Sequence, residues 1–298
     1  MTAAARLLGV RVVLLLVLLA VGCGGDEADT SESVSAAPAE AEPKRGGTLR
    51  VAVFSDHSTF DPTKALATPD ILVIRQAYDN LILLDPDDLS LIPMLAQSWE
   101  SNDDLTQFTF RLRQGVKFRH GKEFEAEDVV FTFNRLLEPD VGSRIAAGLD
   151  TVTKVVALDE RTVRFYLDSP NLYLPDLTTV FHARIIPSEI DPEPLVNEVF
   201  GTGPFILEEH VVGERIVMVR NPDYWWEGYP YLNEVIFFYV PNPETRAEAL
   251  KAGAVDVIYD LDASSVSALE AHPETRVSES ASRSWGADKA SRSCVIVM

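Results

Sequence analysis

Residues 108–136 read FTFRLRQGVKFRHGKEFEAEDVVFTFNRL, and two hydrophobic periods meet within them. In 108–113 every second residue is apolar, which predicts a strand whose arginines face solvent. In 126–137 the apolar residues recur at helical spacing, and Glu127 and Asp128 stand near the positive end of that helix. His120 falls in the turn between the two elements. Each charge has a structural explanation, so the stretch is interpreted as scaffold rather than as a catalytic site.

Similar local patterns run through the chain from Gly46 onward. GTLRVAVF (47–54) alternates like a strand, and a loop (55–67) leads into a helix with Thr68 as N-cap and Pro69 in its first turn. Residues 151–168 and 203–225 predict hairpins that turn at 159–160 and 213–214. Residues 242–253 predict a helix between an Asn242 N-cap and a glycine C-terminal cap. Strands, helices and hairpins interleave, which predicts a mixed α/β fold.

The composition narrows the classes of function. The chain has 298 residues, of which 46% are hydrophobic, enough for a sizeable core. It carries 46 acidic and 26 Lys or Arg residues, a formal charge of -20. Because this charge repels phosphate backbones and no basic stripe is present, nucleic acid is not expected as a partner.

Cysteine and histidine spacing indicates neither a disulfide framework nor a metal site. The two cysteines are Cys23 and Cys294, and no CxxC pair occurs. The five histidines, at 57, 120, 182, 210 and 272, lack HxH or HxxxH spacing. No metal and no cofactor are therefore expected.

The first residues have the pattern of a secretory signal. Arg6 and Arg11 precede ten uninterrupted apolar residues (12–21), a run too short to span a membrane as a helix. Residues 20–23, Ala-Val-Gly-Cys, resemble the lipobox of bacterial lipoproteins, which implies a signal peptide over 1–22 and lipidation of Cys23. An ordinary secretory signal with an incidental cysteine is the alternative. The acidic segment that follows, up to residue 45, has too little apolar surface to fold and is expected to be a flexible linker.

Four segments, in order, resemble one known family. They are GGTLRVAV…FDP (46–62), residues 91–136 around LRQGVKF and AEDVVFTF, GTGPFILEE (201–209) and NPDYWWEGYPYLNEVIF (221–237). Together they are similar to the family 5 extracellular solute-binding proteins, the peptide and nickel receptors of ABC importers. Arg119 and His120 depart from the family pattern, which usually has an acid before the glycine.

The resemblance implies a periplasmic-binding-protein-like lobe built from 46–80 and 200–262, with an α+β subdomain inserted at 81–199. It implies a monomer, anchored by lipid at the outer face of the cytoplasmic membrane, that binds a small peptide and delivers it to permease subunits. Two segments are expected to face the ligand and to offer main-chain groups to it. Their residues are Ser55, Asp56, His57, Thr59, Phe60, Gly201, Thr202, Gly203, Pro204 and Phe205. For 201–205 plain turn chemistry is an equal alternative. The aromatic residues of 224–231 are expected to pack the lobe rather than to stack on a ligand.

The family pattern stops near residues 278–283. Within the atypical tail (278–298), residues 283–298, RSWGADKASRSCVIVM, show no helical or strand period before the last four, and the second lobe of the family is missing. A premature end by frameshift or truncation is the hypothesis, and it predicts an exposed sheet edge. A fragment that does not function is therefore one alternative reading.

Other functions remain open at the level of sequence. Nickel, oligosaccharide or haem are alternative solutes within the family, and a structural lipoprotein without a solute is a further alternative. A hydrolase is remote, because GxSxG, HExxH and P-loop motifs are absent from the sequence. The chain is accordingly not expected to be an enzyme.

Overall fold

The computed structural model describes residues 43–85, 88–281 and 292–297, and its largest element is a seven-stranded sheet. The strand order is β12-β13-β11-β1-β10-β9-β8. The bounds are β1 Thr48–Val53, β8 Phe205–Val211, β9 Arg215–Arg220, β10 Glu234–Tyr239, β11 Val257–Ile258, β12 Val277–Ala281 and β13 Arg292–Val297. β1 is central and parallel to both neighbours, so that Val51 stands opposite Phe237 on one side and Val257 on the other. Only strands distant in sequence flank β1.

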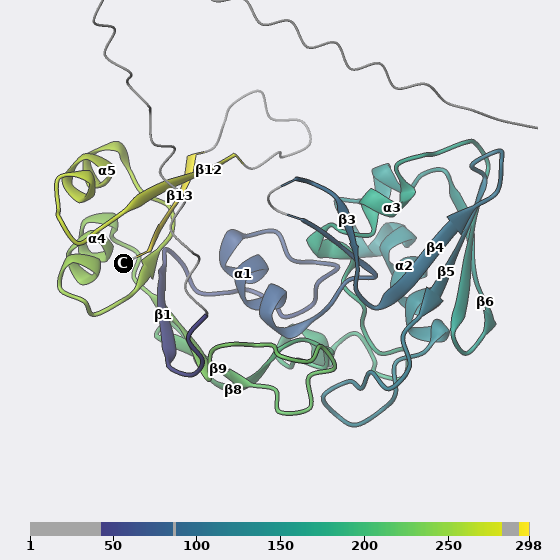
Figure 1. Cartoon of the computed structure of the whole chain (residues 1–298), viewed down its shortest axis with the longest axis horizontal. Helices are drawn as coiled ribbons and strands as arrows, with labels where there is room; N and C mark the ends of the chain where they lie inside the picture. The colour runs from purple at the N-terminus through teal and green to yellow at the C-terminus, as the bar shows by residue number, and fades with distance from the viewer. Residues whose placement is uncertain (1–42, 86–87, 282–291, 298) are drawn as a thin grey trace, which may run out of the picture. The chain divides into compact units, whose positions relative to one another are not determined.

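A second sheet is antiparallel and four-stranded, with the order β4-β5-β7-β6. Its strands are β4 Ala96–Ser101, β5 Gln107–Leu112, β6 Val152–Asp159 and β7 Thr162–Leu167. Helix α2 (Ala126–Leu137) lies against this sheet and buries Val129, Phe133 and Leu136 (Figure 1). A short pair, β2 (Ile82–Leu84) and β3 (Leu91–Pro93), precedes the sheet.

The remaining helices are short. They are α1 Thr68–Ala77, α3 Leu174–Leu177, α4 Pro243–Lys251 and α5 Ala263–Glu270, with 3-10 turns η1 Pro139–Val141, η2 Ala146–Gly148, η3 Phe181–Ala183 and η4 Pro194–Val196. Helix α4 has the predicted cap, because the Asn242 side chain accepts a hydrogen bond from the Thr245 N–H at 2.8 Å. The N-cap of α1 is Ala67, one residue before the predicted Thr68, and the Asp70 carboxylate accepts from the Ala67 N–H at 3.3 Å.

Two large hydrophobic cores follow the two sheets. The first surrounds Phe110, Phe133 and Phe165, between α2 and the four-stranded sheet. The second includes Phe60, Tyr78 and Phe237 and lies under the seven-stranded sheet. A buried ion pair between Arg135 of α2 and Asp61, in the loop after β1, links the two regions.

Both predicted hairpins are confirmed, with turns between β6 and β7 and between β8 and β9. In β5 the solvent-facing interpretation holds for Arg111, whereas Thr109 is buried and receives a hydrogen bond from Arg164 Nε at 2.9 Å. Arg113 is half-buried, with its guanidinium 4.8 Å above the Trp225 ring.

The structure describes part of the predicted atypical tail. Residues 277–281 form β12, and residues 292–297 form β13, which pairs with β12 and with β11. Residues 282–291 lie outside the described residues, and a strand occupies the side of β11 away from β1. Among the described residues, no helix is long and apolar enough to cross a membrane.

Candidate functional site

The loop after β1 carries the first group of predicted ligand-binding residues. The carboxylate of Asp56 holds this loop to the β8–β9 hairpin, because its Oδ2 accepts from the Gly213 N–H at 2.6 Å. Its Oδ1 lies 3.4 Å from His210 Nε2 and 3.5 Å from His57 Nδ1. The structure thus brings His210 to the adjacent residues Asp56 and His57, although Asp56 and His210 are 154 positions apart in the sequence.

His57 is buried in this cluster, with only 4% of its side chain exposed. Its ring lies 3.9 Å from the Phe60 ring and 4.4 Å from that of His210, centroid to centroid. Its Nε2 has no hydrogen-bond partner among the described residues. Burial, and then the neighbouring His210, lower the pKa of His57, so the ring is neutral at pH 7.

Asp56 stays ionised at neutral pH. Burial alone would raise the pKa of its carboxyl group, but the hydrogen bond from the Gly213 N–H, and then the adjacent Tyr239 phenol and the His210 and His57 rings, hold the pKa below its ordinary value. For Tyr239, burial and the adjacent Asp56 carboxylate both raise the pKa of the phenol. A charged acceptor therefore stands beside two imidazoles and a protonated phenol.

The rest of the loop is anchored inward. Thr59 is buried, and its Oγ1 accepts from the Asp61 N–H at 3.0 Å. Phe60 is fully buried in the core, and its N–H donates to the Val196 carbonyl at 3.2 Å. The Ser58 N–H and hydroxyl both donate to Asp70, at 2.6 and 2.9 Å. The main-chain groups of Ser55 and Asp56, at the start of the loop, make no hydrogen bond within the described residues.

The Gly201–Phe205 segment is packed against the end of α1. The Gly203 N–H donates to the Ala77 carbonyl at 2.9 Å, and the Gly201 carbonyl accepts from the Arg119 N–H at 3.1 Å. A Cβ on Gly201 would lie 2.0 Å from the Ala77 oxygen, and one on Gly203 would lie 2.4 Å from the Ala77 carbonyl carbon. Thr202 and Phe205 are buried, and the carbonyl oxygens of Gly203 and Pro204 accept from Asn221. These contacts give the segment a packing role, and a binding role for it stays a prediction.

A buried carboxylate, Asp79, collects three donors from distant parts of the chain. It accepts from Trp225 Nε1 at 2.9 Å, Thr202 Oγ1 at 3.0 Å and the Tyr224 hydroxyl at 3.2 Å. Burial raises the pKa of Asp79, and these donors oppose the rise. Burial also lowers the pKa of nearby Arg184 to about 10, while attraction to Asp79 opposes that shift. This network fastens the 221–226 segment to the end of α1.

The predicted aromatic segment forms a ladder of rings. Successive centroids along Tyr224, Trp225, Trp226, Tyr229 and Tyr231 lie 5.1 to 5.5 Å apart. Trp225 at one end is tied to Asp79 and Arg113, whereas Tyr229 is 47% exposed. The ladder is therefore anchored by packing at its Trp225 end.

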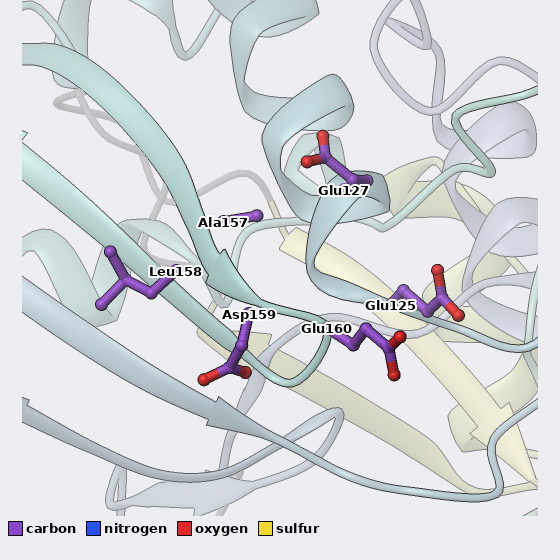
Figure 2. A pocket seen from close by; sticks show the side chains of 6 residues that line it. All are labelled: Glu125, Glu127, Ala157, Leu158, Asp159 and Glu160. Atoms are coloured by element: carbon purple, nitrogen blue, oxygen red, sulfur yellow. The ribbon is translucent and has the colours of Figure 1, made fainter.

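A separate hollow of about 200 Å³ lies between the start of α2 and the β6–β7 turn (Figure 2). Its lining consists of Glu125, Glu127, Ala157, Leu158, Asp159 and Glu160. In Figure 2 the Glu125 and Glu160 carboxylates extend to the same side, and Asp159 points away from Glu127. The hollow lies on the four-stranded sheet, whereas the Asp56 cluster joins β1 to the seven-stranded sheet's outer hairpin.

The family of the chain follows from comparison with known proteins. Residues 90–288 match the model of the bacterial extracellular solute-binding proteins, family 5, middle region. The match covers more than half of the chain, so the protein belongs to this family of extracellular solute-binding proteins. The resemblance carried by LRQGVKF and AEDVVFTF is confirmed.

Curated relatives include binding proteins for different solutes. The chain is 29% identical over 274 residues to di/tripeptide-binding protein 2 of Pseudomonas aeruginosa, which covers 83% of this chain and 51% of the relative. It is 32% identical over 202 residues to the nickel-binding periplasmic protein of Escherichia coli, covering 65% of this chain and 38% of the relative. The chain thus spans about half the length of the first of these relatives, and less of the second.

Solved structures share the fold. The periplasmic binding protein DppA from Helicobacter pylori, in complex with the peptide STSA, superposes with a TM-score of 0.72 at 28% identity, over 80% of this chain and 51% of that chain. Haemophilus influenzae OppA, in complex with RPPGFSPFR, gives 0.71 at 27% identity, over 79% and 50%. The predicted fold class, a mixed α/β fold of the periplasmic binding protein type, is confirmed.

Sequence reasoning missed His210 and Asp79. His210 lies on β8 within FILEEHV, whose alternation predicts a strand but gives no sign of a partner in the loop after β1. Asp79 follows α1 in a segment read only for its apolar positions. Their partners lie 123 to 154 positions away in the sequence, and no local pattern indicates such contacts.

Proposed function

We propose that this protein captures small peptides outside the cytoplasm and passes them to the permease of an ABC importer. In this proposal residues 46–80 and 200–262 are one lobe of the receptor and 81–199 are an insert. A di/tripeptide-binding relative and two peptide-bound structures of the same fold support the choice of solute. The relatives are named as binding proteins, which supports a receptor rather than an enzyme.

One observation carries the proposal. The main-chain N–H and C=O groups of Ser55 and Asp56 have no hydrogen-bond partner within the described part of the chain, and both residues are only half-buried. They follow the end of β1, a central strand of the sheet, after Phe54. An extended peptide pairs with such groups as an added strand would, and its side chains contribute little to that pairing. Recognition of this kind accepts many sequences.

The test is calorimetric titration of the purified protein with trialanine and with trialanine methylated at its central amide nitrogen. Methylation removes one main-chain donor and leaves the side chains unchanged. We expect trialanine to bind, and the methylated peptide to bind about fivefold more weakly, since a hydrogen bond contributes about 1 kcal/mol. Equal affinity for the two peptides would exclude main-chain recognition.

The other solutes of the family form the second arm of that test. Nickel, haem and an oligosaccharide are titrated under the same conditions, because relatives named for nickel and haem binding match the chain as well. Binding of one of these solutes without any peptide binding would replace the peptide in the proposal.

We also propose that Cys23 anchors the receptor by lipid after removal of residues 1–22, with the acidic segment 23–45 as a flexible linker. Cys23 and residues up to 42 lie outside the described residues. Support comes from the sequence alone, in the apolar run that ends at Ala-Val-Gly-Cys. Several acyl chains make a durable anchor, because each buried CH₂ contributes about 0.8 kcal/mol.

A further inference from the structure

We propose that Asp56, His57 and His210 form a binding site for a divalent transition metal ion, of which Zn²⁺ is the best match, and that the ion fastens the loop after β1 to the β8–β9 hairpin. One oxygen of Asp56 and one nitrogen from each histidine lie mutually within 4.8 Å. The three residues come from two elements that no local contact in sequence brings together.

The spacing of the ligand atoms fits a metal polyhedron better than it fits hydrogen bonds. Asp56 Oδ1 lies 3.4 Å from His210 Nε2 and 3.5 Å from His57 Nδ1. Both distances are longer than those of an ordinary N–H···O hydrogen bond, which are about 2.7–3.2 Å. Zinc bonds of about 2.0–2.2 Å to nitrogen and oxygen give a tetrahedron with edges of about 3.3–3.5 Å. Two edges of that tetrahedron are therefore already present.

The chemistry of the three groups also suits such an ion. Imidazole nitrogens and a carboxylate are ligands for zinc, copper and nickel, and the ligand set lacks the all-oxygen character that calcium and magnesium prefer. The second Asp56 oxygen is fixed by the Gly213 N–H at 2.6 Å, which orients the first toward the two rings.

The buried His57 ring supplies an independent reason. With 4% of its side chain exposed, it makes no hydrogen bond from Nε2 within the described residues, and its Nδ1 contact is long. Leaving a buried polar group unpaired costs about 1–3 kcal/mol. An ion bound at Nδ1, the nitrogen that faces Asp56, gives this buried atom a ligand bond in place of the 3.5 Å contact, and the ring proton then lies on Nε2.

The test is a competition titration of zinc chloride, in the presence of a chromogenic chelator, on the full chain freed of metal. Both cysteines are alkylated in every sample, so that thiolates do not bind zinc. We expect one zinc ion per chain and at least tenfold weaker binding in Asp56→Asn, His57→Gln and His210→Gln. His272→Gln, which removes a half-buried histidine elsewhere, is the matched control and keeps the affinity of the parent.

Hydrogen exchange of residues 54–60 tests the fastening role. Zinc is expected to slow exchange in this loop in the parent protein and in His272→Gln, and to leave it unchanged in His210→Gln. His210 is decisive because its side chain is 21% exposed on a surface hairpin, a place where glutamine is accommodated. Unaltered zinc affinity in His210→Gln, or absence of zinc binding at micromolar concentrations in the parent, overturns the site. Zinc binding without slower exchange overturns the fastening role.

The inference stands apart from the peptide proposal. If the chain binds zinc but no peptide, the metal site is supported and the proposed function is contradicted. If the chain binds peptide but no zinc, the proposed function is supported and the metal site is contradicted. Performing both titrations on the same preparation separates the two results.

Discussion

Gly201 and Gly203 occupy positions where a side chain has no room. A Cβ at Gly201 would meet the Ala77 carbonyl oxygen at 2.0 Å and the Tyr78 ring at 2.6 Å. The neighbouring atoms belong to the α1 backbone and to the buried Tyr78 ring, and displacing either would cost considerable free energy. The turn is therefore constrained by contact with α1, independently of any ligand.

Replacing Gly201 by alanine is expected to lower the free energy of unfolding by about 3 kcal/mol or more, because overpacking of this severity forces the backbone to shift. Gly213→Ala is the control: its φ of +75° strains an alanine, but nothing lies within 4 Å of the added carbon, so we expect a loss of about 1 kcal/mol. Chemical denaturation of both variants gives the two values. Equal losses would contradict the steric account.

His182 makes the folded state sensitive to acid. Its Nε2 donates to the Ala65 carbonyl at 3.1 Å, and burial lowers the pKa of the ring from 6.5 to about 4. Between these pH values the unfolded chain binds a proton that the folded chain does not, so stability falls as the pH is lowered.

His182→Asn should remove this part of the pH dependence, which amounts to about 1–2 kcal/mol between pH 7 and pH 5. His272→Asn, at a half-buried position outside this contact, is the matched control. Denaturation midpoints at the two pH values measure the effect. A parent and a His182→Asn variant with the same pH slope would show that folding does not lower the pKa of His182.

Local residue chemistry predicted some positions well and others not at all. Asn242 was found because an N-cap is defined by the three residues that follow it. The N-cap of α1 is Ala67 rather than the predicted Thr68, and the Asp70 carboxylate accepts a hydrogen bond from the Ala67 N–H. The Asp56 cluster could not be predicted from local sequence, because His57 and His210 come together only when β1 and β8 join the same sheet.

At the scale of elements, one ion pair joins α2 to the loop after β1. Arg135 and Asp61 are both buried, with 7% and 0% of their side chains exposed. Asp61 also accepts from the Thr63 N–H and hydroxyl at 2.9 and 2.7 Å. The opening stretch of sequence, scaffold by its pattern, thus positions the loop that is proposed to bind the ligand.

Arg135→Met is expected to cost about 3–5 kcal/mol, because it leaves a buried carboxylate without its cation. The double variant Asp61→Asn with Arg135→Met should recover part of that loss, since no charge then remains uncompensated. Thermal and urea unfolding of the single and double variants form a double-mutant cycle. Strictly additive losses would show that the pair does not couple the two elements.

Elements formed by neighbours in sequence were predicted and elements formed by distant pairing were not. The β6–β7 and β8–β9 hairpins and helix α2 follow from turn residues and hydrophobic period. The parallel pairing of β1 with β10 and β11 leaves no local signal. β12 pairs with β13 although VSESA has only one large apolar residue, so its place depends on its neighbour.

At the scale of the whole molecule, the fold class was available from sequence only through family resemblance. Composition and period predicted a mixed α/β chain, and the family segments predicted its architecture. The solute was not available, because relatives of similar identity are named for peptide, haem and nickel binding. The chain also spans only about half of the di/tripeptide-binding relative.

Lipid anchoring is tested on the whole protein in a bacterial host. Labelled palmitate is expected to enter the parent and Cys294→Ala, and to be absent from Cys23→Ala, which should also leave the membrane fraction. Because acyl chains supply the membrane affinity, loss of Cys23 removes it. Label retained in Cys23→Ala would rule out anchoring at this cysteine.

Hydrogen exchange of the purified protein, with and without a pool of di- and tripeptides, tests the account most directly. If residues 55–58 bind the peptide, their amides exchange more slowly when peptide is present. Smaller changes are expected in 201–205, where main-chain groups already form hydrogen bonds within the protein. Unchanged exchange throughout the chain, or protection confined to segments far from the loop after β1, would contradict it.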